Sequence, residues 1–108
     1  MFARLIDIKT KPGKATELCH TIHDKVLTYL KGAPGFMDEL VLVNQAEADH
    51  VLAISLWKTD EDAQRFSHEH FPKIREMIEH HVHAAPKVHT YAVDSSTAHH
   101  IAAGKSAA

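Results

Sequence analysis

Hydrophobic and polar positions alternate over residues 2–9, near the start of the chain. Alternate side chains of an extended segment point to opposite sides, so one side carries Arg4 and the other carries Asp7. Apolar residues accompany both of them: Phe2, Ile6 and Ile8 beside Arg4, and Ala3 and Leu5 beside Asp7. The pattern predicts a strand with two partly apolar faces.

The spacing of apolar residues changes to three and four positions after the turn signal Lys11-Pro12-Gly13. The positions that follow this spacing are Ala15, Leu18, Cys19, Ile22, Val26, Tyr29 and Leu30. Gly32 suits the carboxyl end of a helix, and Pro34 cannot continue one. We therefore predict a helix that ends near Leu30.

Two further apolar segments, residues 36–44 and 50–58, are separated by a short polar connection. Neighbouring strands with a short link usually pair as an antiparallel hairpin. The second segment is apolar on both faces, which is typical of a central strand.

Thr59 or Asp60 begins a second helix, with acidic residues in its first turn. Pro72 removes a backbone hydrogen bond from a continuous helix but suits the first turn of a new one. We therefore expect a break near His70 and a second helical segment from Phe71 to about residue 83.

A last strand is predicted over residues 87–94, which completes the order strand–helix–strand–strand–helix–strand. This order defines an α+β ferredoxin-like sandwich with helices on one sheet face. We expect one such domain over residues 1–94. Residues 95–108 are rich in Ser, Ala, Gly and His and are predicted to be a tail that is disordered or ordered only against a partner.

Both faces of the central strands are apolar, yet helices would cover only one of them. A large bare apolar face is unusual for a monomer, so we expect a homodimer that packs sheet on sheet.

Composition limits the kinds of binding partner and the cellular compartment that we expect for this protein. The formal net charge is -2 and no long block of like charge occurs, so nucleic-acid and membrane-surface binding have no electrostatic support. The single Cys19 excludes an internal disulfide. No signal peptide or membrane span is visible, and a cytoplasmic location is expected.

Three local features carry a resemblance to a known family: Pro34-Gly35-Phe36 before a strand, Leu56-Trp57-Lys58-Thr59 at the end of the next strand, and Asp62-Ala63 with Phe66 in the following helix. With them, residues 1 to about 94 resemble the antibiotic-biosynthesis-monooxygenase-like family. Its members adopt the dimeric α+β barrel fold, in which two ferredoxin-like sandwiches share a sheet barrel.

The resemblance implies a cofactor-independent monooxygenase that uses molecular oxygen on a small aromatic or quinol substrate. The alternative is a non-catalytic dimeric barrel that binds a small hydrophobic ligand, because a fold fixes no reaction. The family also includes haem-degrading oxygenases. At their Asn, Trp and His positions, read without gaps from Trp57, this chain has Asp7, Phe66 and Glu76. The leading interpretation therefore requires no cofactor. Haem binding is a third alternative, in which His70 or His80 would be the ligand after a shift in the helix.

Asp7 and His70 are the candidate catalytic residues. If the side of Asp7 faces the helices, its carboxylate would be partly buried and able to take a proton from a phenol or quinol. The resulting electron-rich anion could react directly with oxygen, and His70 would assist. The plain alternatives are an Asp at a strand end paired with Lys or Arg, and a His that bonds backbone freed by Pro72.

Trp57, Phe66 and His81 are the candidate substrate-binding residues. The two aromatic rings would wall the pocket, although packing in the core or dimer interface explains them at least as well. The pair His80 and His83 has a spacing of three residues, but zinc needs three or four ligands, so no metal site is expected.

Overall fold

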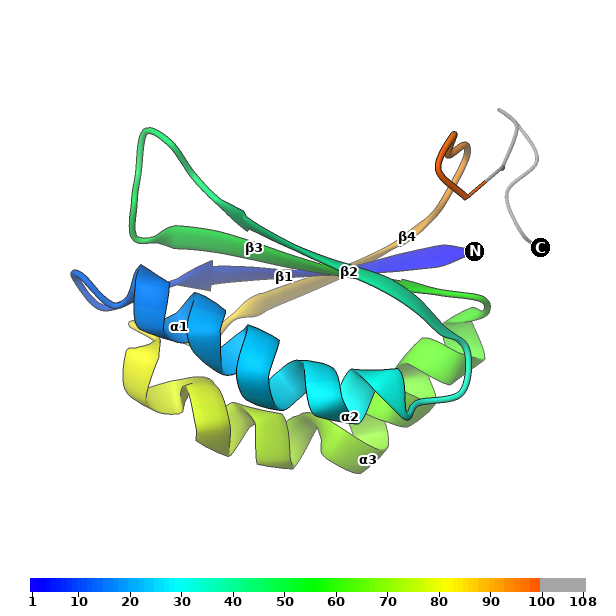
Figure 1. Cartoon of the computed structure of the whole chain (residues 1–108), viewed down its shortest axis with the longest axis horizontal. Helices are drawn as coiled ribbons and strands as arrows, with labels where there is room; N and C mark the ends of the chain where they lie inside the picture. Colours follow the sequence, from blue (N-terminus) through cyan, green and yellow to red (C-terminus); the bar gives the residue numbers. More distant parts are fainter. Residues whose placement is uncertain (100–108) are drawn as a thin grey trace.

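The computed structural model describes residues 1–99, which form one four-stranded sheet with a layer of helices on one side (Figure 1). The strands are β1 (Phe2–Lys9), β2 (Phe36–Val43), β3 (His50–Trp57) and β4 (Lys87–Ala92). The helical elements are α1 (Ala15–Thr21), the π-helical turn η1 (Ile22–Val26), α2 (Leu27–Lys31), α3 (Asp60–Ile78) and the short 3-10 turn η2 (Glu79–His81).

The order along the chain is the predicted βαββαβ order, and the ferredoxin-like arrangement is confirmed. In the sheet, the strand order is β2-β3-β1-β4 and all neighbours are antiparallel. The predicted hairpin of β2 and β3 is present. β1 and β3 occupy the centre, where Ile6 lies opposite Ala53 and Leu5 lies opposite Ile54.

The sheet face that packs against the helices carries Arg4. On this face Ile8 and Val51 lie opposite each other and are 1% and 0% exposed. The Arg4 Nη2 donates a hydrogen bond to Ser67 Oγ of α3 at 2.9 Å, and burial lowers the pKa of Arg4. Asp7 therefore points to the opposite face. The catalytic role predicted for Asp7 required its side of β1 to face the helices, and in this structure it does not.

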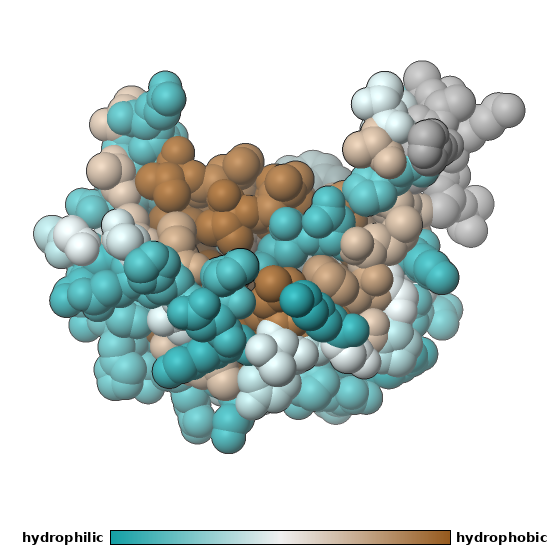
Figure 2. All heavy atoms as spheres, viewed as in Figure 1, coloured by the Kyte–Doolittle hydropathy of each residue, from teal (hydrophilic) through white to brown (hydrophobic). Residues whose placement is uncertain are grey.

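The opposite face of the sheet, called here the helix-free face, is largely apolar, as predicted. Strand register places on it Ala3, Leu5 and Asp7 of β1, Leu40 and Leu42 of β2, Leu52, Ile54 and Leu56 of β3, and His89 and Tyr91 of β4. Figure 2 shows hydrophobic residues gathered in a hollow above the sheet, between the β2–β3 connection and the segment after β4.

The first helix runs from Ala15 to Lys31, close to the predicted bounds, but a π turn interrupts it at Ile22–Val26. Its buried side chains include Leu18 and Leu30. These belong to a core cluster that the helices share with Trp57 and the other inward residues of the sheet.

The second helix, α3, starts as predicted and then passes through Pro72 without a break. The Thr59 hydroxyl accepts a hydrogen bond from the Asp62 backbone N–H at 3.1 Å and so caps the helix. The break predicted near His70 is wrong. Pro72 is on the solvent side, where water can satisfy the carbonyl it leaves free, and buried Phe66 and Ile74 hold the helix to the core on both sides of it.

The predicted tail starts inside the described residues. The His99 backbone N–H donates to Ser96 Oγ at 3.3 Å, and His99 Nε2 lies 3.6 Å from Asp38 Oδ2 of β2. Residues 100–108, the remainder of the predicted tail, lie outside the described residues. Within residues 1–99, no helix is both long and apolar enough to cross a membrane.

Candidate active site

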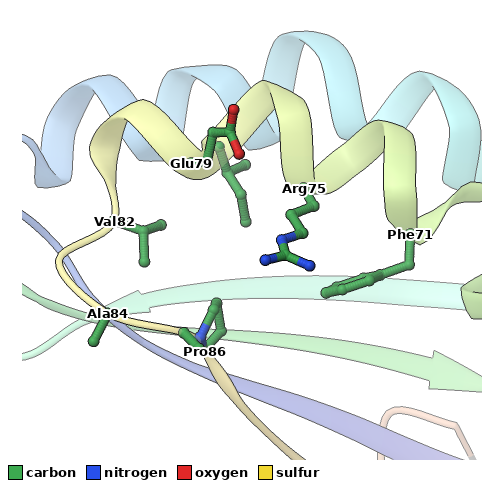
Figure 3. Close-up of a pocket in the computed structure, with 8 residues that line it drawn as sticks. Phe71, Arg75, Glu79, Val82, Ala84 and Pro86 are labelled. Carbon is green, nitrogen blue, oxygen red and sulfur yellow. The ribbon is translucent and has the colours of Figure 1, made fainter.

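A pocket of about 300 Å³ lies between the second half of α3 and the segment that leads into β4 (Figure 3). Its lining residues are Phe71, Arg75, Ile78, Glu79, Val82, Ala84, Ala85 and Pro86. The spacing of Phe71, Arg75 and Ile78 puts them on one side of the helix, one turn apart. The volume is at the lower end for small-molecule pockets, and most of the lining is apolar, as in such pockets.

The wall opposite α3 is fixed to the end of β1 by backbone hydrogen bonds. The Lys11 N–H donates to the His81 carbonyl at 2.9 Å, and the His83 N–H donates to the Lys9 carbonyl at 2.8 Å. These bonds hold the connection beside α3, so the pocket is built from two anchored segments.

Arg75 supplies the positive charge of this pocket. In Figure 3 its guanidinium extends from α3 into the space between Phe71 and Pro86, whereas the Glu79 carboxylate lies against the helix and away from Pro86. Within the described part of the chain, Arg75 forms no ion pair. An apolar pocket with one available guanidinium can hold an apolar ligand that carries an anionic oxygen.

Asp7 does not line this pocket. On the helix-free face, its Oδ1 and the Nε2 of His50 form a hydrogen bond, and His50 Nδ1 lies 3.9 Å from Glu47 Oε2. Asp7 and His50 also line a shallow hollow of about 310 Å³ there, together with Leu42 and other residues. The hydrogen-bond partner of Asp7 is thus a His, not the Lys or Arg of the plain alternative.

Three of the predicted site residues come together elsewhere, in a series of aromatic rings. The His70 ring lies 5.5 Å from the Tyr29 ring and 5.0 Å from the Phe66 ring, and Phe66 lies 5.2 Å from Trp57. Trp57 is fully buried, and its Nε1 donates to Ser55 Oγ at 2.8 Å. Trp57 and Phe66 are therefore core residues in this structure.

His70 and Phe66 also border a hollow of about 290 Å³ beside Tyr29 and Asp62. This hollow is separate from the pocket of Arg75, with which it shares no lining residue. Because His70 belongs to the helix layer and Asp7 to the helix-free face, the structure does not bring the two candidate catalytic residues together.

His81, the fifth candidate, links two helical elements. Its Nδ1 lies 3.6 Å from Glu17 Oε2 of α1, and its side chain is mostly buried. Its backbone carbonyl, through the bond from Lys11, helps to fix the pocket wall, but its side chain does not line the pocket.

The sequence analysis missed Phe71, Arg75 and Glu79. The available signal was the spacing of Phe71, Arg75 and Ile78 along α3, which places Phe71 and Arg75 one turn apart and in line with the core residue Ile78. It also missed Glu39, a charged residue on the inward side of β2. Burial and the neighbouring Asp38 raise the pKa of Glu39 to about 7.

The pocket residues do not fit haem. Haem iron takes an axial His, Cys, Met or Tyr, and none of these residue types lines the pocket of Arg75. Phe66 lies in the core, and Glu76 is exposed on α3. Among residues 1–99, no group of three or more His, Cys, Asp or Glu side chains is arranged to hold a metal ion.

Comparison with known protein families shows to which family the chain belongs. The sequence profile described as antibiotic biosynthesis monooxygenase matches residues 1–85, most of the described domain. The protein therefore belongs to the antibiotic biosynthesis monooxygenase family. No protein with a curated function matches the sequence.

Solved structures of other proteins share the fold at low sequence identity. The monooxygenase from the gene ActVA-Orf6 of Streptomyces coelicolor, in complex with nanaomycin D, is 13% identical, with a TM-score of 0.76 over 88% of each chain. SnoaB, a cofactor-independent oxygenase from Streptomyces nogalater, is 10% identical, with a TM-score of 0.74 over 89% of this chain and 95% of that one. A conserved protein from Methanosarcina mazei Go1 is 14% identical, with a TM-score of 0.72 over 83% of this chain and 89% of that one.

Proposed function

We propose that this protein is a cofactor-independent monooxygenase that binds a small phenol or quinol in the pocket of Arg75. The observation that carries the proposal is the Arg75 guanidinium, which extends into a small apolar pocket without an ion-pair partner among the described residues. Family membership and the oxygenases among the structural neighbours support the class of reaction.

In the proposed reaction, a hydroxyl of the substrate first gives its proton to solvent water, which reaches the open pocket and returns a proton when the peroxide breaks down. A guanidinium close to this oxygen favours the anionic form, so Arg75 lowers the free energy of the phenolate. The ring carbon of the anion then gives electrons to molecular oxygen and forms a carbon–oxygen bond. Loss of water from the peroxide leaves a quinone, so one phenol and one oxygen molecule give one quinone and one water.

The apolar wall has a separate role in this scheme. Phe71, Val82 and Pro86 offer contact area to an aromatic ring, while the exposed Arg75 meets its anionic oxygen at the open side of the pocket. The earlier assignment of Asp7 as base, with His70 as its helper, stays a prediction beside this proposal. The present scheme does not use it, because neither residue lines the pocket.

We also propose that the working form is a homodimer joined through the helix-free face, with no nucleic acid or membrane as partner. On this face Leu40, Leu42 and Tyr91 are 48%, 47% and 55% exposed. Burial of a contiguous apolar face in a symmetric pair removes it from water and supplies a driving force for association.

The alternative function is a non-catalytic barrel that binds a small hydrophobic ligand. The separation of Asp7 from His70 favours it, because these two candidate acid–base residues do not line the same pocket. Oxygen consumption separates the two functions. The purified protein would be incubated with naphthols and alkyl-hydroquinones under ¹⁸O₂. The proposal predicts a quinone that carries one labelled oxygen, whereas binding without oxygen consumption for every compound would favour the alternative.

A further inference from the structure

A second groove lies between the first helix and the edge strand β2, away from the pocket of Arg75. Its volume is about 580 Å³, and the two sites share no lining residue. Leu27 of α2 and Phe36 and Val41 of β2 provide an apolar lining. Cys19 of α1 also lines the groove, and burial raises the pKa of its thiol.

Charged side chains also line the groove: Lys31 of α2, and Asp38 and Glu39 of β2. Glu39 is the one whose position in the strand is unexpected. It lies on the inward side of β2, opposite Ser55, with Val41 next on the same side. The inward positions of a strand normally hold apolar residues, and departures from this pattern occur mainly at functional sites.

The Glu39 carboxylate has no partner in the described part of the chain. No hydrogen bond reaches its side chain, and Lys31, His20 and His23, which also line the groove, form no ion pair with it. The hydroxyl of Ser55, its neighbour across the strands, accepts a hydrogen bond from Trp57 Nε1. A half-buried carboxylate in this setting is stabilised by any cation that reaches it.

The helix that faces Glu39 is irregular at the same place. The π turn η1 spans Ile22–Val26, and His23 from this turn lines the groove. Single π turns inside α-helices are rare, and those that occur are often at functional sites. The π turn is therefore an independent indication that this surface binds a ligand.

We propose that this groove binds a small protonated amine with an apolar body. The ammonium group would pair with Glu39, and the body would pack against Leu27, Phe36 and Val41. The Phe36 ring adds a favourable face for a cation. The groove carries the carboxylates of Asp38 and Glu39 beside Lys31, whereas the pocket of Arg75 carries its guanidinium beside Glu79, so the ligands proposed for the two sites differ in charge. This inference does not depend on oxygenase activity.

The test uses benzylamine as the probe and benzyl alcohol as its neutral counterpart, each titrated at pH 8 into ¹⁵N-labelled protein. Benzylamine should shift the backbone amide resonances of residues 36–41 and of η1. Glu39→Gln should weaken its binding by at least about tenfold, because the variant removes the charge and keeps the shape. Glu61→Gln, which removes an exposed carboxylate at the start of α3, should leave the affinity unchanged.

Benzyl alcohol should bind the wild-type protein at least about tenfold more weakly than benzylamine, which tests the role of charge without any variant. Benzylamine that shifts no groove resonance would overturn the proposal. Equal binding of benzylamine to wild type and Glu39→Gln, or equal binding of the two probes to wild type, would overturn it too.

Discussion

The carboxylate of Asp7 and the imidazole of His50 form a hydrogen bond between the neighbouring strands β1 and β3, on the helix-free face. Their side chains are 38% and 35% exposed. Asp7 is thus paired on the face of the sheet that lies away from α3, and the pocket of Arg75 does not include it.

This pairing predicts the outcome of Asp7→Asn. We expect oxygen uptake with a good substrate to stay within about twofold of wild type, because no transition-state contact is removed. The measurement is an oxygen-electrode assay, with His50→Gln as the control for the loss of the pair. A loss of activity confined to Asp7→Asn would restore Asp7 as the base.

Gly35 is predicted to be the turn residue that tolerates least change. Its φ is +81°, and a Cβ at this position would collide with the side chain of Asp62, in the first turn of α3. Gly35→Ala should lower the free energy of unfolding by about 1–3 kcal/mol, through backbone strain and this clash. Urea denaturation measures the change.

The matched control for Gly35 is Gly32→Ala. Gly32 has an ordinary φ of -88°, and its added Cβ would meet only the Tyr29 carbonyl oxygen at 3.9 Å. We expect no loss of stability there. Equal unfolding midpoints for Gly35→Ala and wild type would show that the turn is not constrained as described.

Glu39 should make stability depend on pH. Its pKa in the folded protein is about 7, against an ordinary value of 4.5, so between these values the folded state holds more protons than the unfolded state. Its contribution is therefore most favourable below pH 4.5, and the free energy of unfolding falls as pH rises to about 7. Allowing for solvent screening of a half-buried group, we expect a fall of about 1–2 kcal/mol.

Glu39→Gln should abolish this part of the pH dependence and raise stability at pH 8 by the same amount. Thermal unfolding of both proteins from pH 4 to pH 8 gives the difference, in which the contributions of the His residues cancel. A constant difference across this range would contradict the raised pKa.

Leu42 tests the proposed dimer interface. Leu42 lies on the helix-free face, whereas the neighbouring Val43 points to the other face and is 48% exposed. Leu42→Asp places a charge in the proposed interface and should dissociate the dimer, because burying an unpaired carboxylate is costly. Val43→Asp should leave the dimer intact, because Val43 lies on the other face of the sheet. Sedimentation velocity of the three proteins decides, and a wild-type monomer at micromolar concentration would refute the interface.

The order of the elements could be predicted from the sequence because hydrophobic periodicity is a local signal. Alternation marked β1, the three-and-four spacing marked the first helix, and Thr59 marked the start of α3. The break predicted near Pro72 was wrong. The free energy that Pro72 costs the helix locally is smaller than the free energy gained when Phe66 and Ile74 pack against the core.

The site was harder to predict because both sides of β1 contain apolar residues. Alternation separates Arg4 from Asp7 but does not say which of them faces the helices, and the packing of the whole domain decides this. The pocket of Arg75 needs a non-local contact as well. The segment of Pro86 becomes its wall only because two backbone hydrogen bonds, from the Lys11 N–H and to the Lys9 carbonyl, hold the connection beside α3.

The central claim is that Arg75 stabilises a substrate anion in this pocket, and Arg75→Met tests it most directly. The control is Arg65→Met, which removes an exposed α3 arginine paired with Asp62. We expect kcat/KM for oxygen uptake to fall by about 10- to 100-fold in Arg75→Met, which is about 1.4–2.7 kcal/mol of transition-state stabilisation. Arg65→Met should keep wild-type activity. Equal kcat/KM values for Arg75→Met and wild type would contradict the account.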